Sequence, residues 1–288
     1  MVTNKQKTIN YFPVKNRVFL APMEEVNDIA FRLLCKKAGA GAVYTGMIHP
    51  RTKQHIPLDD KPVLQLFCTS TKGIPEFMQK HDSKVLAWDF NLGCPAKTAR
   101  KHCFGAFMNH KLEDIESILK IMRENTKKSL FVKIRKTKSS FKILKIAEKY
   151  CDAVCIHPRT QLQGYSGVPD IEFARKLKQK TNLPVVYSGD VTENDYKSFL
   201  EEFDYVMIGR KAIGNPNIFS INSNKKFSKI TFKDYLDIAE KYQLPFKQLK
   251  LQAMNFTKGL PNATELREEI FKIKTKKGLK EFSEKNDF

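Results

Sequence analysis

The chain has 288 residues, enough for one large domain with a small appendage but short for two full-sized domains. Hydrophobic residues make up 41% and charged residues 28%, a balance that excludes disordered and fibrous proteins, and no apolar run approaches the roughly 18 residues of a membrane span. The 51 Lys and Arg exceed the 31 Asp and Glu by 20 charges. This surplus favours a polyanionic partner such as nucleic acid, although charge alone is equally compatible with a lysine-rich surface that binds nothing.

The cysteines provide no framework for disulfides or a metal. No two of them form a CxxC pair, and no His and Cys residues stand at zinc spacing, so we expect neither a disulfide nor a metal site. The first twenty residues carry lysines but no apolar signal-peptide stretch, so we expect a cytoplasmic protein. Cysteines in such a protein are usually small buried groups, which we expect of Cys35, Cys68, Cys151 and Cys155.

Short β-rich runs alternate with helical patterns over the first three quarters of the chain, and several runs are continuously apolar, as in strands covered on both faces. The predicted strands are 18–23, 42–47, 62–67, 85–91, 130–135, 153–157, 184–188 and 205–209. The predicted helices are 28–38, 112–125, 141–150, 171–180 and 193–202. Strand and helix units of this number predict a (β/α)8 TIM-type barrel over residues 1–224. An open doubly wound sheet is the alternative, but no GxGxxG turn follows the first strand.

The last part of the chain reads as helices without strands between them. Amphipathic patterns at 232–242, 246–256 and 265–273 predict a small all-α domain over residues 225–288. We expect Asn262 to cap the third of these helices, with Glu265 reaching back to the cap.

In barrels of this kind the functional residues follow the carboxyl ends of the strands, and a phosphate commonly binds the loops after strands seven and eight. The seventh strand here ends in Ser188, Gly189 and Asp190, and the eighth in Gly209 and Arg210. Small residues let backbone N–H groups approach an anion, and a guanidinium pairs with it. Their paired placement favours a phosphate site over two ordinary glycine turns.

Lys133 lies in the middle of an apolar strand, where its amine requires a partner. One candidate is an electron-poor ring such as a flavin, whose reduced form carries negative charge. The other is an ion pair with a carboxylate at a strand end, which the residues alone favour. The roles of Gln65 and His157 are equally ambiguous from the residues alone. A single histidine on an apolar strand is more often a core residue than a catalyst.

Cys94 stands between Gly93 and Pro95, just after a strand, so its thiol is held on a stiff turn at the barrel mouth. A thiol with a pKa of about 8.5 is mostly protonated at neutral pH and can donate a proton. A nucleophilic role would need a partner base, and neither His102 nor His157 stands at a spacing that identifies one. Lys97 and Arg100 follow on the same loop, where positive charge suits a phosphodiester backbone.

The motifs at these positions, taken in order, resemble those of the tRNA-dihydrouridine synthases. The resemblance runs nearly from end to end, from LAPMEEVNDIAFRLLC at 20–35 to LQAMNFTKGLPNATELREEI near the C-terminus. Between them lie VLQLF, VKIR, IHPRT, GYSG and SGD, and the most specific pieces are NLGCP and IGRKAIGNP. The resemblance implies a flavin enzyme that reduces the C5–C6 double bond of uridines in tRNA, with a helical domain that binds the RNA.

The resemblance also implies roles for single residues. FMN would contact Pro22, Met23, Gln65, Lys133 and His157, and its phosphate would bind Ser188, Gly189, Asp190, Gly209 and Arg210. Cys94 would be the general acid, and the substrate would meet Asn91, Lys97, Arg100, Arg159 and Tyr165. NADPH would be the reductant, and the protein would act as a monomer without metal. The family commonly has Asn where Ser188 stands, Glu where Gly46 stands and Gly where Pro158 stands.

Two further functions remain open on the sequence. A small-molecule flavin oxidoreductase of the dihydroorotate dehydrogenase-like type would share the barrel and the phosphate loops but would not need the helical domain. A non-catalytic RNA-binding relative would keep the charge and the fold, and the departures at Gly46 and Ser188 are its only indications.

Overall fold

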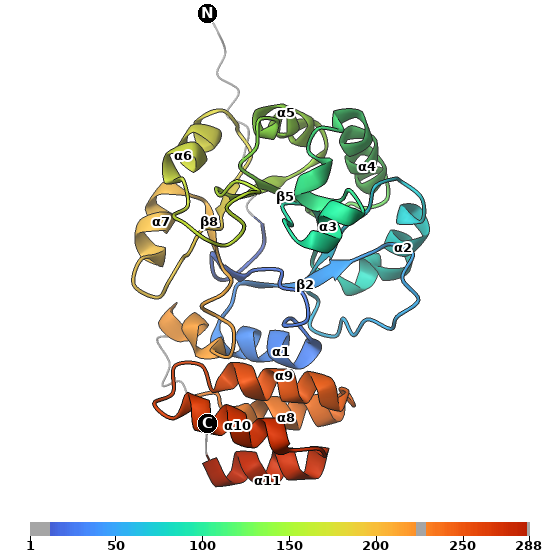
Figure 1. Cartoon of the computed structure of the whole chain (residues 1–288). Helices are drawn as coiled ribbons and strands as arrows, with labels where there is room; N and C mark the ends of the chain where they lie inside the picture. Colours follow the sequence, from blue (N-terminus) through green and yellow to red (C-terminus); the bar gives the residue numbers. More distant parts are fainter. Residues whose placement is uncertain (1–11, 223–228, 287–288) are drawn as a thin grey trace, which may run out of the picture.

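The computed structural model describes residues 12–222 and 229–286, and its centre is a closed barrel of eight parallel strands (Figure 1). Each strand pairs with the next, and β8 pairs with β1, which closes the barrel and excludes an open sheet. The strands are β1 Val18–Leu20, β2 Ala42–Ile48, β3 Val63–Leu66, β4 Ala87–Leu92, β5 Leu130–Arg135, β6 Ala153–His157, β7 Val185–Tyr187 and β8 Tyr205–Ile208. The predicted (β/α)8 barrel is therefore confirmed.

Helices surround the barrel in the connections between strands (Figure 1). The α-helices are α1 Ile29–Ala38, α2 Ile74–His81, α3 Lys97–Lys101, α4 Leu112–Glu124, α5 Ser140–Tyr150, α6 Ile171–Gln179 and α7 Tyr196–Glu202, and the 3₁₀ helices are η1 Asp82–Lys84, η2 Gly105–Met108 and η3 Pro216–Asn222. The sequence analysis missed α2 and α3. α2 has a proline in its first turn, and α3 is five residues long, too short to show a helical repeat.

Four helices follow the barrel: α8 Phe232–Lys241, α9 Phe246–Phe256, α10 Ala263–Lys272 and α11 Lys276–Asn286. The first three match predicted helices, and α11 was not predicted. Asn262 makes no side-chain capping bond, so the expected cap of α10 is wrong; its φ of −105° and ψ of 32° lie outside the extended conformation of a capping residue. The capping box occurs instead at the start of α8, between Thr231 and Asp234.

The C-terminal helices are attached to the barrel at the start of α1. Asp28 caps α1 by accepting a hydrogen bond from Phe31 N at 3.0 Å. Its second carboxylate oxygen accepts from Gln248 Nε2 at 2.7 Å, Gln252 Nε2 at 2.8 Å and the Tyr235 hydroxyl at 3.2 Å. One half-buried carboxylate thus joins α8 and α9 to the barrel, and desolvation raises the pKa of Asp28.

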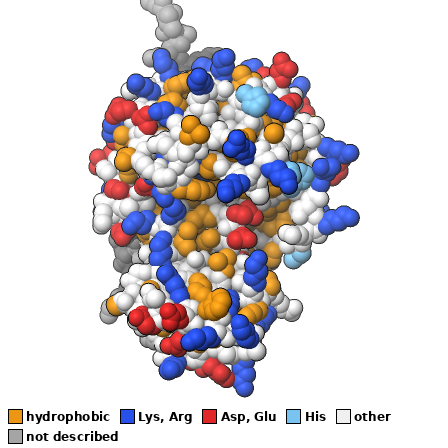
Figure 2. Space-filling model, viewed as in Figure 1, with side chains coloured by type: hydrophobic (Ala, Val, Ile, Leu, Met, Phe, Trp, Pro, Cys, Tyr) orange, Lys and Arg blue, Asp and Glu red, His pale blue; other side chains and the backbone are white. Residues whose placement is uncertain are grey.

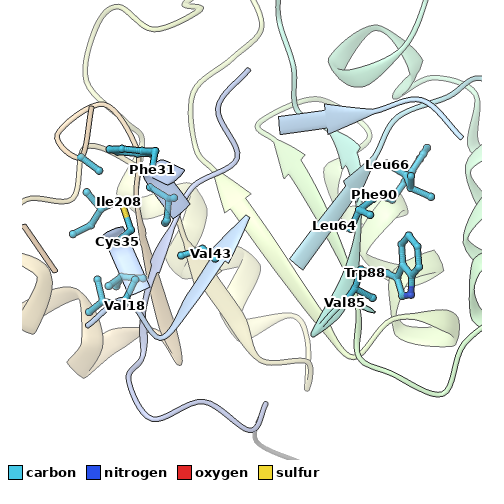
Figure 3. Close-up of a cluster of buried hydrophobic side chains, with 14 of the residues drawn as sticks. Val18, Phe31, Cys35, Val43, Leu64, Leu66, Val85, Trp88, Phe90 and Ile208 are labelled. Atoms are coloured by element: carbon cyan, nitrogen blue, oxygen red, sulfur yellow. The ribbon is translucent and has the colours of Figure 1, made fainter. Parts of the chain in front are cut away.

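The core has two parts, one between strands and helices and one inside the barrel. Figure 3 shows the first part, where Phe31 and Cys35 pack near Val18 and Trp88 lies with Phe90 on the outer face of β4. The inner part includes Phe19, Tyr44, Phe131 and Tyr205. Phe12 closes the amino end of the barrel: its N–H donates to the Tyr205 hydroxyl at 3.0 Å and its ring meets that of Phe131 at 4.9 Å. The opposite, carboxyl end is where we expect the functional residues of such a barrel.

Within the two described ranges, no helix is both long and apolar enough to cross a lipid bilayer.

Candidate active site at the carboxyl end of the barrel

The structure brings the predicted site residues to one end of the barrel because all eight strands run parallel. Gln65, Asn91, Lys133 and His157 lie within strands β3, β4, β5 and β6, near their carboxyl ends. The remaining predicted cofactor residues lie in the loops that follow β1, β7 and β8, and these are Pro22, Met23, Ser188, Gly189, Asp190, Gly209 and Arg210.

The loop that carries Cys94 is held from two sides. Asn91 Oδ1 accepts hydrogen bonds from Gly93 N at 3.1 Å and from Cys94 N at 3.0 Å. The carbonyl of Cys94 accepts from Ala106 N at 3.1 Å. A Cβ at Gly105 would lie 2.8 Å from that carbonyl, and Gly105 has a φ of +60°, so only glycine lets the two segments meet here.

The Cys94 thiol is half-buried, and desolvation raises its pKa, although a backbone hydrogen bond and the charges of Arg135 and Lys133 oppose the shift. None of the six histidines hydrogen-bonds this thiol, so no base is placed to make it a thiolate. A protonated thiol at the mouth is a proton donor, the first of the two roles that the sequence left open. Cys35, Cys68, Cys151 and Cys155 are buried as predicted, and Cys103 is exposed.

Lys133 is half-buried, and its ammonium makes no hydrogen bond or ion pair with any residue of the two described ranges. The ion pair that the residues alone favoured is therefore not formed. The charge of Lys133 acts on Asp89 on β4, which the sequence analysis did not single out. Asp89 is fully buried, and desolvation raises its pKa to about 7 although Gln65 and Lys133 oppose the shift.

His157 is a neutral imidazole with one free nitrogen. Its Nδ1 contacts the carbonyl of Ser188, and because a carbonyl only accepts, Nδ1 carries the proton and Nε2 is an acceptor. Nε2 is buried and has no partner among the described residues. Burial and the nearby charges of Lys133 and Arg135 lower the pKa of His157 to about 2. Because buried polar groups are normally hydrogen-bonded, the unpartnered Nε2 of His157 and the nearby ammonium of Lys133 indicate a binding site for a polar ligand.

The loops after β7 and β8 meet at Asp190. Its carboxylate accepts hydrogen bonds from Arg159, which lies after β6, and from Arg210, which lies after β8. Burial favours a higher pKa for Asp190, but the two guanidinium groups outweigh it and the pKa is lowered. Arg210 also donates to the Tyr165 carbonyl at 2.8 Å. The loops after β7 and β8 therefore lie side by side, as a shared anion site requires. The Arg210 guanidinium, however, already donates to Asp190 and to the Tyr165 carbonyl.

The predicted substrate residues differ in exposure. Lys97 and Arg100 are exposed on α3 and have no ion pair within the described ranges. Tyr165 is 59% exposed, with Arg135 and Arg210 each 5.8 Å from its ring centroid. Arg159 is 1% exposed and bonds to Asp190 and to the carbonyls of Ser166 and Gly167. Its guanidinium thus braces the loop after β6, and its proposed contact with the substrate stays a prediction. Asn91 is likewise buried, under Cys94.

A cavity of about 530 Å³ lies beside the Cys94 loop and was not predicted. Its walls come from the loop after β1, the ends of β2 and β3, and the α3 segment, and the lining residues are Glu24, Met47, His49, Phe67, Cys68, Thr69, Thr98, His102 and Phe104. The rings of Phe67 and Phe104 meet at 4.4 Å, which gives the cavity an aromatic wall. Only the fold brings these segments together, because no sequence pattern joins them.

Basic side chains spread over this face of the molecule. Figure 2 shows Lys and Arg around a central area of hydrophobic and acidic side chains, in the view where α3 crosses in front of the strands in Figure 1. No group of three or more His, Cys, Asp or Glu side chains in the described part of the chain is arranged to hold a metal ion.

Comparisons with known proteins place the chain in one family. A family model described as Dihydrouridine synthase (Dus) matches residues 19–288. Among curated proteins, tRNA-dihydrouridine synthase B of Pasteurella multocida (strain Pm70) is 27% identical, covering 74% of this chain and 70% of that protein. A probable tRNA-dihydrouridine synthase of Rickettsia bellii (strain RML369-C) is 29% identical, covering 90% of this chain and 91% of that protein.

Solved structures show similarity of fold alone. A 2-naphthoyl-CoA reductase in complex with 2-naphthoyl-CoA has a TM-score of 0.50 at 12% identity, covering 72% of this chain and 49% of that chain. The 6-hydroxypseudooxynicotine amine oxidase of Pseudomonas geniculata N1 has a TM-score of 0.50 at 12% identity, covering 88% and 50%.

Proposed function

This chain belongs to the dihydrouridine synthase family, and from that premise we propose that it reduces the C5–C6 double bond of uridines in transfer RNA, using FMN as cofactor and NADPH as the source of electrons. The curated relatives with this activity in their names support the substrate class. The observation that carries the proposal is the half-buried Cys94 thiol at the same barrel end as Lys133, whose ammonium has no partner in the described part of the chain, and as the buried, unpartnered Nε2 of His157.

The residues at the mouth fit a flavin. Neither His157 Nε2, a buried acceptor, nor the Lys133 ammonium has a partner among residues 12–222 and 229–286, and a ring with a polar edge would satisfy both. A fixed cation also favours the anionic reduced form of such a ring. Pro22 and Met23 are half-buried and offer apolar contact. The adjoining loops at Ser188–Asp190 and Gly209–Arg210 are the proposed phosphate site.

The chemistry divides between the cofactor and the chain. FMN in its reduced form would supply a hydride to C6 of the uracil. Cys94 donates its thiol proton to C5, which completes 5,6-dihydrouridine, and the thiolate then recovers a proton from solvent. Asn91 orients the Cys94 backbone, and Arg135 fixes the same loop by donating to the Gly93 carbonyl at 3.0 Å.

The substrate must present a base outside its stack, which costs a few kcal/mol that phosphate contacts can offset. Lys97 and Arg100 on α3 are placed for such contacts, and Tyr165 offers an exposed ring flanked by two guanidinium groups. We propose that residues 225–288 form a helical RNA-binding domain after a catalytic barrel over residues 1–224.

The test uses the full-length protein. We expect it to be yellow as purified or after incubation with FMN, and to convert uridine to dihydrouridine in an unmodified tRNA transcript with NADPH, detected as a gain of two hydrogens by mass spectrometry. A colourless protein would contradict the proposal in favour of a non-catalytic RNA-binding relative. Turnover of a free pyrimidine without turnover of tRNA would favour a small-molecule oxidoreductase. Mapping of dihydrouridine in RNA from cells lacking the protein identifies the modified position.

A further inference from the structure

Asp89 lies inside the barrel on β4, two residues before Asn91, where its side chain is 0% exposed. One carboxyl oxygen, Oδ2, accepts a hydrogen bond from Gln65 Nε2 at 2.5 Å. The other, Oδ1, has no partner among the described residues. Desolvating a carboxyl group costs several kcal/mol unless its interactions compensate, so an apolar or amide side chain would make a more stable barrel here. The retained carboxyl group therefore requires an explanation other than stability.

The hydrogen bond to Gln65 is the first of a directed series. Gln65 Oε1 accepts from Asn91 Nδ2 at 2.7 Å, and Asn91 Oδ1 accepts from Cys94 N at 3.0 Å. The two ends of this series have fixed roles. A backbone N–H can only donate, and the carboxyl oxygen Oδ2 accepts whether or not Oδ1 carries a proton.

Each amide between those ends has one donor end and one acceptor end. Gln65 must turn its NH₂ toward Asp89, which leaves its oxygen for Asn91. Asn91 must then turn its NH₂ toward Gln65, which leaves its oxygen for the Cys94 N–H. The register that makes this possible is Gln65 opposite Asp89 on neighbouring strands. An acceptor at position 89 thus matches the one arrangement of the two amides in which the Asn91 oxygen faces the N–H groups of Gly93 and Cys94.

We propose that Asp89 is a positioning residue for Cys94, acting through the ordered amides of Gln65 and Asn91. The inference rests on the proposed function for the importance of Cys94, but the hydrogen-bond series and its effect on the thiol stand apart from any reaction. The loop is otherwise held from above by Ala106 N, which donates to the Cys94 carbonyl at 3.1 Å. Arg135 also holds the loop, by donating to the Gly93 carbonyl at 3.0 Å, and loss of the series leaves the loop with these two contacts.

The experiment reads the Cys94 thiol directly. In a Cys103→Ser background, Cys94 is the only cysteine that is not buried, so its alkylation by iodoacetamide can be followed by peptide mass spectrometry. Asp89→Leu removes the acceptor, which should expose the thiol and speed its alkylation by about threefold or more. Asp89→Asn keeps an acceptor oxygen of the same reach and should alkylate at the wild-type rate.

Two further variants complete the test. Gln65→Leu breaks the middle of the series and should speed alkylation by the same factor as Asp89→Leu, and the two effects should not add in the double variant. Asp82→Leu is the matched control, because Asp82 accepts from Trp88 Nε1 at 2.8 Å at the opposite end of β4. It should leave the alkylation rate unchanged.

Several outcomes would overturn the inference. Equal alkylation rates in Asp89→Leu and Asp89→Asn would show that the acceptor does not matter. Additive effects in the double variant would show that Asp89 and Gln65 act separately. Should Asp89→Leu fail to fold, Gln65→Leu carries the test, and an unchanged rate there contradicts the proposal. Dihydrouridine formation is measured in parallel and should fall about 10- to 100-fold in Asp89→Leu. A changed thiol in a protein with no activity on tRNA supports the inference and refutes the proposed function.

Discussion

Glu24 occupies the space that a side chain at position 46 would fill. A Cβ on Gly46 would lie 3.2 Å from Glu24 Oε2, and the same oxygen accepts a hydrogen bond from Met47 N at 3.1 Å. The family that the sequence resembles commonly has Glu at position 46, on the second strand. This chain has glycine there, and the carboxylate of Glu24, from the loop after β1, lies beside that position instead. Glu24 lines the cavity next to the Cys94 loop, and we expect a substrate nucleotide to enter there.

We therefore expect Gly46→Ala to act only through Glu24. Glu24→Ala should lower kcat/KM for tRNA about tenfold, the value of one hydrogen bond to a charged group, and Gly46→Ala should have a similar effect by displacing the carboxylate. In the Glu24→Ala background, Gly46→Ala should change little further. Steady-state kinetics of the two single variants and the double variant test this, and additive losses would show that Gly46 has a separate role.

Replacement of Cys94 separates proton donation from cofactor binding. Cys94→Ala should keep its flavin absorbance and slow dihydrouridine formation by about 10² to 10⁴, the usual value of positioned general-acid catalysis. Cys103→Ser is the control: this thiol is exposed and donates a weak hydrogen bond to the Arg100 carbonyl at 3.9 Å, and the activity of the variant should be unchanged. Full activity in Cys94→Ala would refute the acid role.

Asp190 pairs with the buried Arg159 and the exposed Arg210, and we expect substitutions in this cluster to affect stability and FMN binding differently. Asp190→Ala leaves the buried Arg159 without its carboxylate and should lower the free energy of unfolding by about 2 kcal/mol, less than for a fully enclosed pair because Asp190 itself is half-exposed. Arg210→Ala removes an exposed partner and should cost at most about 1 kcal/mol, yet should weaken FMN binding if Arg210 serves the phosphate. Denaturant unfolding and FMN titration distinguish the two, and equal FMN affinity in Arg210→Ala and wild type would contradict the phosphate site.

The free energy of unfolding should depend on pH because of the ionisation of Asp89. Its pKa is about 7 in the fold and about 3.9 in an unfolded chain, so its contribution is fully present below about pH 4 and is lost as the pH rises through about 7. The difference in unfolding free energy between wild type and Asp89→Asn should therefore shift against the wild type between about pH 4 and 7, by up to about 1.4 kcal/mol per pH unit.

His157 has the opposite effect on stability. Its pKa is about 2 in the fold and about 6.5 in an unfolded chain, so the unfolded state takes up a proton first and the protein loses stability as the pH falls below about 6.5. It is present in both proteins and cancels in that difference. Urea unfolding at several pH values measures the effect, and a difference that does not change with pH would show that Asp89 ionises normally.

The basic residues on α3 should bind RNA phosphate. Lys97→Ala and Arg100→Ala should each weaken tRNA binding and reduce the slope of log K against log salt by about 0.7 to 0.9 per lost contact. Lys84→Ala and Lys127→Ala are matched controls, since both residues are exposed near the amino ends of β4 and β5. If the α3 variants and the control variants had equal slopes, the RNA phosphates would not contact α3.

The amino-acid sequence by itself determined the barrel and the positions that line its mouth. Apolar runs such as AVCIH define strands, the helical repeats between them force parallel crossovers, and parallel strands bring their carboxyl ends together. Cys94, Lys133 and the loops after strands seven and eight were found in this way. Local spacing failed where an element was short, as in α3, or where a side chain did not adopt the capping geometry, as at Asn262.

Only the tertiary structure decided which partners these residues have. Asp89 stands beside Gln65 because β3 and β4 pair in one register, Arg159 is buried because the loop after β7 turns Asp190 toward it, and Glu24 meets Gly46 across β1 and β2. These contacts join segments from different strands, and a shift of one residue in pairing would send each side chain to the other face. Interactions of this kind depend on register and loop path, which no local pattern of residues encodes.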